Sequence, residues 1–358
     1  MDATFNPQEE VICPREFFRR HGERAFAERL RVKAGYVIQQ DNLIDLGEAL
    51  EGGLHLLCEG EPGSGKTALG ECISFAFNLP QDFLPCHEEL ERRDLIGDFD
   101  GKAQDRAYNR VLAAGGSVAE AEAAQYTIDC FRMGAFLYPF HFRATTGIPC
   151  TGLWDEVEKL MQAREIMAYE ILARGYAHVR GLHPSPYVGI RDGGMLPLII
   201  ATTNNMKTGE KRGDKDSLTE PFRDRFITTF VDTPGLKEKV EIVRAQVPEA
   251  SQRIVTQLVK IAKEIELMPE VSKKPTLRRL INLARSLVRS GVPEINHEIL
   301  RRKLCHLSTQ KKDRVNLKES VGLLIRRSNE AMREGGADVD EMIGRIFEPA
   351  GVEALTTV

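Results

Sequence analysis

Short, continuous apolar runs alternate along the first two-thirds of the chain with stretches in which apolar residues recur at helical spacing. Residues 54–58 and 196–203 form the clearest runs, which are typical of strands buried on both faces of a parallel sheet. Helical periodicity dominates from residue 234 onward, for example over 237–247 and 254–267. The pattern predicts an α/β fold, a three-layer αβα sandwich followed by a small all-α lid domain.

The same pattern divides the chain into three regions. Residues 1–35 are polar and charged, with Phe17, Phe18 and Phe26 as large apolar anchors, and we predict an N-terminal arm there. Residues 36–233 are expected to form the sandwich, and 234–358 the helical lid and C-terminal helices. Within the sandwich, a β-hairpin is predicted over 177–190, and residues 131–142 read as a hairpin or an inserted loop.

A glycine-rich turn follows the apolar run at 54–58 and leads into a helical stretch. Its glycines let the backbone point successive N–H groups inward, beside the positive end of the helix dipole, so that the turn would bind an anion. Strand, glycine-rich turn and helix stand in the order of a P-loop, in which Lys66 would reach the β- and γ-phosphates and Thr67 would hold Mg²⁺. The predicted nucleotide-binding residues are Gly60, Glu61, Pro62, Gly63, Ser64, Gly65, Lys66, Thr67 and Ala68.

Acidic and amide side chains follow two further apolar segments. Asp155 would position Mg²⁺, and Glu156 would polarise the attacking water. The alternative is a helix N-terminus, where acids are favoured by the helix dipole. The catalytic interpretation is preferred because the pair follows a P-loop in the chain. Asn204 follows the run at 196–203, where its amide would contact the γ-phosphate and the lytic water; an asparagine turn is the alternative.

Three arginines are candidates for contact with the developing charge. Arg223 and Arg225 are surface charges, internal ion pairs or, at the edge of a subunit, groups that stabilise phosphoryl transfer in a neighbouring copy. Arg278 lies in the first turn of a predicted helix and would face the nucleotide from the lid.

Composition excludes few classes of protein. Apolar content is 42% and charged content 28%, and no apolar run approaches the roughly 18 residues of a membrane span. The N-terminus lacks a secretory signal, and seven cysteines without CxxC pairs indicate reduced, buried thiols, so a cytoplasmic location is expected.

The charge is divided unevenly. Residues 234–358 hold 23 Lys/Arg and 17 Asp/Glu, a net charge of +6, which leaves −10 for residues 1–233 out of a total of −4. A basic C-terminal part suits nucleic acid or an acidic partner, but a solvated helical face is the favoured interpretation.

Taken in order, these elements resemble those of an AAA+ ATPase, over roughly residues 36–290. Within that superfamily the chain resembles the MoxR group through residues 60–69, 94–97, 170–181, 200–204 and 224–226. The resemblance implies that the P-loop is Walker A, Asp155 and Glu156 are Walker B, Asn204 is sensor 1, Arg223 or Arg225 is the arginine finger, and Arg278 is sensor 2.

The same resemblance implies a homo-oligomer, commonly a hexameric ring, that uses ATP and Mg²⁺ to remodel a protein partner, often one with a von Willebrand A domain. We therefore expect an ATP-hydrolysing chaperone-type ATPase that remodels or activates a partner complex. A nucleic-acid translocase or motor subunit is the first alternative, because residues 234–358 are net positive. A nucleotide-controlled switch with little hydrolysis is the second, because Pro149 and Gly152 weaken the strand before Asp155.

Overall fold

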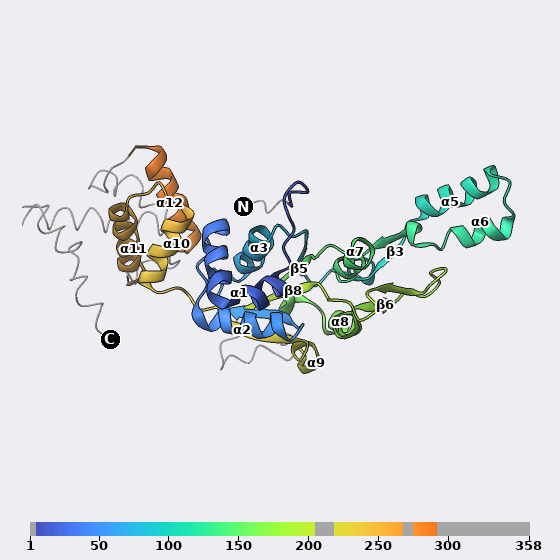
Figure 1. The fold of residues 1–358 in the computed structure, drawn as a ribbon, viewed down its shortest axis with the longest axis horizontal. Coiled ribbons are helices and arrows are strands. Elements are labelled where there is room, and N and C mark those ends of the chain that lie inside the picture. Colours follow the sequence, from blue (N-terminus) through green and yellow to red (C-terminus); the bar gives the residue numbers. More distant parts are fainter. Residues whose placement is uncertain (1–4, 205–217, 268–274, 292–358) are drawn as a thin grey trace, which may run out of the picture. The chain divides into compact units, whose positions relative to one another are not determined.

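The computed structural model describes residues 5–204, 218–267 and 275–291 (Figure 1). The chain divides into two compact units, Met1–Thr233 and Pro234–Val358. The sequence pattern also predicts a charged loop over residues 207–217 and helices over 319–332 and 342–347, and all three segments lie outside the described residues.

A five-stranded parallel sheet forms the centre of the first unit. Its strands stand in the order β2-β5-β8-β1-β9, and every neighbouring pair is parallel. Because parallel strands end at one edge, the carboxyl ends of β1, β5 and β8 lie together, with Gly60 in register with Asn204. The bounds of the strands are β1 His55–Gly60, β2 Gln81–Pro85, β5 Thr151–Asp155, β8 Leu198–Asn204 and β9 Phe226–Phe230.

Helices cover both faces of this sheet, which confirms the predicted α/β sandwich. Successive residues of a strand point to opposite faces, so Leu56 and Leu57 belong to different core clusters, as do Leu153 and Trp154. The cluster that holds Leu56 includes residues of α1 Pro14–Arg29, η1 Leu30–Ala34, α2 Gln40–Glu51 and α3 Lys66–Ala76. The other includes residues of α7 Tyr138–Thr146, α8 Gln162–Arg174 and α9 Glu220–Arg223.

Residues 14–34 do not form the N-terminal arm that the sequence suggested. Phe26 and Leu30 are fully buried, and the Phe26 ring stacks on Phe77 with ring centroids 4.7 Å apart. The Arg29 Nε donates a hydrogen bond to the backbone oxygen of Ala76 at 2.8 Å. The average composition of residues 14–34 is polar, but their apolar side chains include one buried stripe along the helices. A single apolar stripe is enough to bury a helix against a sheet.

A long insertion separates β2 from β5. It contains α4 Arg92–Leu95, β3 Gly97–Phe99, α5 Gly101–Ala113, α6 Val118–Ala124, η2 Ile128–Cys130 and β4 Phe131–Met133. β3 and β4 pair antiparallel, and α5 and α6 project away from the five-stranded sheet (Figure 1). The prediction for residues 131–142 was therefore wrong, because this segment begins as the second strand of a long-range pair and continues into α7. Its partner strand lies more than thirty residues earlier, too far for a local turn signal.

The hairpin predicted over residues 177–190 is present. β6 Tyr176–His178 pairs antiparallel with β7 Tyr187–Gly189. Thr127, after α6, forms an isolated bridge with His183 in the hairpin loop, so the hairpin and the insertion are joined.

The described part of the second unit is helical, as predicted. It consists of α10 Leu236–Gln246, α11 Gln252–Leu267 and α12 Leu277–Arg289, packed around a core of their own that includes Val243, Leu258 and Leu280. Among all described residues, no helix is long and apolar enough to cross a membrane, and the six cysteines there are free.

Candidate functional site

The glycine-rich turn leaves β1 at the carboxyl edge of the sheet and enters α3. Gly63 and Gly65 have φ values of 89° and 108°, in the left-handed region that favours glycine. A Cβ on Gly60 would lie 2.3 Å from the backbone oxygen of Val231, so no larger residue fits there. Gly65 is the N-cap of α3 and supplies no capping side chain, which leaves the N-terminal N–H groups of this helix suited to an anion.

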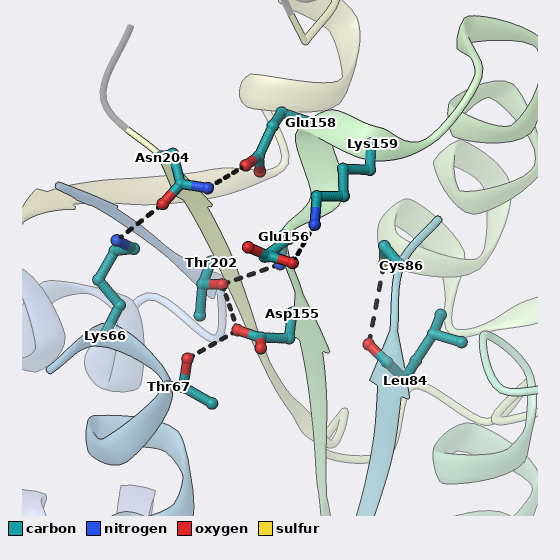
Figure 2. A network of polar contacts seen from close by, with 10 residues as sticks. All are labelled: Lys66, Thr67, Leu84, Cys86, Asp155, Glu156, Glu158, Lys159, Thr202 and Asn204. Carbon is teal, nitrogen blue, oxygen red and sulfur yellow. Dashed lines mark hydrogen bonds and ion pairs between the residues drawn. The ribbon is translucent and has the colours of Figure 1, made fainter. Parts of the chain in front are cut away.

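Lys66 lies within this turn and is only 6% exposed (Figure 2). Its Nζ donates hydrogen bonds to the backbone oxygens of Gly60 and Glu61, at 2.7 and 2.9 Å, and to Asn204 Oδ1 at 3.4 Å. Burial lowers the pKa of Lys66, and nearby carboxylates, Glu158 foremost, oppose that effect. The carbonyl contacts hold the ammonium at the point where a phosphate would replace them as its partner.

The predicted metal-binding pair is brought together from distant parts of the chain. Asp155 Oδ1, at the end of β5, accepts hydrogen bonds from Thr67 Oγ1 at 2.7 Å and from Thr202 Oγ1 at 2.6 Å. The backbone N–H of Cys86 donates to the Asp155 backbone oxygen at 2.8 Å and fixes the end of the strand. Thr202 was not predicted, although it stands two residues before Asn204 and shares its face of β8.

Glu156 follows directly and has an unusual backbone. Its φ is 59°, in the left-handed region, and its N–H donates to Thr202 Oγ1 at 3.0 Å. Its carboxylate forms an ion pair with Lys159, and this hydrogen bond is the main reason why the pKa of Glu156 lies below its ordinary value. The proposed base is therefore ionised and held by a lysine that the sequence reading missed.

A third carboxylate, Glu158, contacts the amide at the tip of β8. Asn204 Nδ2 donates to Glu158 Oε1 at 2.5 Å, while Asn204 Oδ1 accepts from Lys66. The other oxygen, Glu158 Oε2, is buried and has no hydrogen-bond partner in the described parts of the chain. Glu158 lies in η3 Val157–Lys159 and was not predicted, because nothing local distinguishes it from a solvated acid.

The two arginines after β8 differ in their surroundings. Arg223 Nη1 lies 3.4 Å from Glu59 Oε2, so Arg223 pairs with the residue before the P-loop in its own unit. Arg225 has a buried Nε without a hydrogen-bond partner among the described residues. Glu165 of α8 accepts from the N–H and hydroxyl of Thr219, at 3.0 and 2.6 Å, and so anchors the start of α9.

Arg278 is the second residue of α12 and belongs to the second unit. Its role toward a nucleotide stays a prediction.

The donor set suits magnesium together with a triphosphate. Thr67 and Asp155 offer a hydroxyl and a carboxylate, the oxygen donors that Mg²⁺ prefers, and Mg²⁺ usually takes its other ligands from phosphates and water. No group of three or more His, Cys, Asp or Glu residues suited to a metal occurs among the residues that the structure describes. A metal held here would therefore depend on the bound substrate for the rest of its coordination.

No protein-family model matches the chain, and no curated protein matches it. Among solved structures, it is similar to the RuvB Holliday junction branch migration motor of Thermotoga maritima, with a TM-score of 0.41 and 16% sequence identity over 87% of each chain. Two point mutants of that RuvB align with TM-scores of 0.44 and 0.42, each at 18% identity, over 86% and 87% of both chains. At this level of similarity, the functional assignment depends on the geometry of the site.

Proposed function

We propose that the chain is an AAA+ ATPase of the MoxR-like type, which binds ATP with Mg²⁺ and hydrolyses it to ADP and phosphate. One observation carries this proposal: the hydroxyl after the P-loop lysine bonds the carboxylate at the end of β5, with Thr67 Oγ1 and Asp155 Oδ1 2.7 Å apart. If the glycine-rich turn had only a structural role, its folding would not require an acid from β5, which lies 88 residues after Thr67 at Asp155.

The residues of the P-loop would act through charge and N–H donors. Lys66 would exchange the carbonyls of Gly60 and Glu61 for the β- and γ-phosphates, and the first turn of α3 would donate its free N–H groups. Thr67 and Asp155 would hold Mg²⁺, which neutralises charge on the phosphate oxygens when bound.

Glu156 would polarise the attacking water, and Asn204 would hold that water and the γ-phosphate in line. In the structure the Glu156 carboxylate is paired with Lys159, and it must leave that partner before it can polarise a water. Hydrolysis therefore requires a rearrangement of this ion pair.

The proposal includes a ring of copies, commonly a hexamer, in which Arg225 stabilises charge in the neighbouring site. Pairing of Arg223 with Glu59 in its own unit favours Arg225 for that role. Remodelling of a protein partner, such as one with a von Willebrand A domain, follows from the resemblance of the motifs, and a cytoplasmic location is proposed from the unpaired cysteines of the described residues.

ATP binding and turnover of purified protein test this function. Lys66→Ala should abolish binding, and Glu156→Gln should keep ATP bound but unhydrolysed. The exposed substitutions Lys102→Ala and Glu48→Gln are matched controls and should leave both unchanged. Failure of the unaltered protein to bind ATP with Mg²⁺, or rapid turnover by Glu156→Gln, would contradict the assignment.

A nucleic-acid motor is the second candidate, and the β6–β7 hairpin favours it. Residues 175–191 contain no Asp or Glu, and the guanidinium of Arg191 lies 4.5 Å from the centroid of the Tyr187 ring. Basic and aromatic side chains together suit single-stranded nucleic acid. Stimulation of turnover by DNA, with a steep dependence on salt, would support this candidate over protein remodelling.

A nucleotide-controlled switch is the third candidate. The ion pair between Glu156 and Lys159 favours it, because ATP hydrolysis is slow when the residue that should polarise the water is held by another side chain. Turnover far slower than nucleotide exchange would support the switch.

A further inference from the structure

The tip of β8 and the turn after β5 are joined by one continuous polar chain. Lys66 Nζ donates to Asn204 Oδ1 at 3.4 Å, and Asn204 Nδ2 donates to Glu158 Oε1 at 2.5 Å (Figure 2). An ammonium therefore faces the amide oxygen, and a carboxylate faces the amide nitrogen. A flipped amide would place like charges against each other at both ends, so these two neighbours define the orientation of Asn204.

Glu158 is also set apart by its second oxygen. Oε2 is buried and has no hydrogen-bond partner within the described residues. Among the charges near Lys66, the Glu158 carboxylate most strongly opposes the lowering of the lysine pKa by burial. The Glu158 carboxylate is thus within electrostatic reach of Lys66 and Asn204, the two groups that the proposed function assigns to the γ-phosphate.

The oxygens of a γ-phosphate only accept hydrogen bonds, so Asn204 can bind one only through Nδ2. Nδ2 is the atom that Glu158 holds. Nδ2 has two N–H donors and one is bonded to Glu158, so a γ-phosphate bound to the other would lie beside the Glu158 carboxylate, and the two would repel each other as like charges. ADP has no γ-phosphate and does not experience this repulsion.

We propose that Glu158 is a positioning residue that makes the site distinguish ATP from ADP. It holds Asn204 in the absence of the third phosphate, and its charge opposes the approach of that phosphate to Nδ2. This inference rests on the proposed function, because it needs a nucleotide at the P-loop.

Dissociation constants for ATP and ADP, measured with Mg²⁺ by calorimetry, test the inference, with hydrolysis blocked by Glu156→Gln in every protein. Glu158→Gln keeps the shape of the side chain but removes its charge. It should tighten ATP binding about tenfold and leave ADP binding within twofold, because the repulsion between Glu158 and the γ-phosphate acts on ATP alone. Glu158→Asp keeps the negative charge, so its ratio of ATP to ADP affinity should lie between those of the parent protein and Glu158→Gln. The exposed Glu48→Gln should leave this ratio unchanged.

A double-mutant cycle of Glu158 and Asn204 tests whether the effect on ATP binding depends on Asn204. In an Asn204→Ala background, Glu158→Gln should change the ATP-to-ADP ratio by less than half as much, since the amide that draws the γ-phosphate beside Glu158 is gone. An equal change in both affinities, or none, would overturn the inference, as would an undiminished effect without Asn204. If Glu158→Gln fails to fold, the ¹⁵N side-chain amide signal of Asn204 decides: it should shift with ATP and stay in place with ADP. A parent protein that binds neither nucleotide contradicts the proposed function itself, a result distinct from all of these.

Discussion

Thr67 and Asp155 lie 88 residues apart in sequence, and their side-chain oxygens lie 2.7 Å apart in the fold. This hydrogen bond joins the first turn of α3 to the end of β5. Thr202 donates to the same oxygen of Asp155, so the carboxylate is held from two elements before any ligand arrives. Such support would keep a metal-binding carboxylate close to its working position.

The first prediction concerns this hydroxyl. Thr67→Ala should lower turnover at least about tenfold and raise the Mg²⁺ concentration needed for half-maximal rate, because the oxygen donor is lost. Thr67→Ser retains the hydroxyl and should stay within a few-fold of the unaltered protein. Turnover measured against Mg²⁺ concentration checks both, and equal behaviour of the two variants would argue against a metal-binding role.

The second prediction separates the two arginines. Arg225→Ala should bind ATP normally and lose turnover, because its charge would be missing from the neighbouring site. Mixing Arg225→Ala with Lys66→Ala protein should restore part of the activity, since some sites then combine an intact P-loop with an intact Arg225.

Arg223→Ala is the matched comparison. It removes the partner of Glu59, whose side chain is only 10% exposed, so it should lower stability by about 1 kcal/mol. Mixing Arg223→Ala with Lys66→Ala should give no more activity than Arg223→Ala alone. Rescue with Arg223→Ala and none with Arg225→Ala would reverse the assignment.

The third prediction concerns Lys159, whose hydrogen bond keeps the pKa of Glu156 below its ordinary value. In Lys159→Ala that pKa should rise, so the acid limb of the profile of kcat/KM against pH should move to higher pH. Turnover at pH 8, where Glu156 is ionised in both proteins, should rise roughly two- to fivefold, the range that release of an exposed ion pair allows. Lys159→Arg keeps the charge and should leave the acid limb in place; an unmoved limb in Lys159→Ala would contradict the pairing.

The fourth prediction uses His55, at the start of β1. It is buried, and burial, helped by the positive charge of Arg15, lowers its pKa to about 3. The folded protein keeps His55 neutral, whereas the unfolded chain takes up a proton below about pH 6.5. The contribution of this group to stability is therefore complete above pH 6.5 and is lost as the pH falls toward 3.

The slope of the unfolding free energy should then include on the order of 1.4 kcal/mol per pH unit from this histidine. Denaturant unfolding between pH 7 and pH 4.5 measures that slope. A folded His55→Gln variant should lack this contribution while keeping the rest, and an identical slope would show that His55 is protonated in the native state.

The sequence by itself determined the parts whose information is local. Apolar runs and helical spacing specified the sheet and its layers, and β1, β8 and the hairpin of β6 and β7 lie where the pattern placed them. The glycine-rich turn was evident because positive φ values and a close backbone approach at Gly60 leave few residue types to choose from. Local chemistry at strand ends likewise singled out Asp155, Glu156 and Asn204.

Only the tertiary structure decided which side chains meet. Thr202, Glu158 and Lys159 entered the site because parallel register brings the ends of β5 and β8 together, and no local pattern encodes that register. The same holds for Arg223, which looked equivalent to Arg225 until β9 placed it beside Glu59 at the end of β1. Burial of Phe26 depended on the sheet layer that covers it, so residues 14–34 became core rather than arm. Contacts between distant segments arise from the packing of whole elements, and this is where sequence periodicity ceases to be informative.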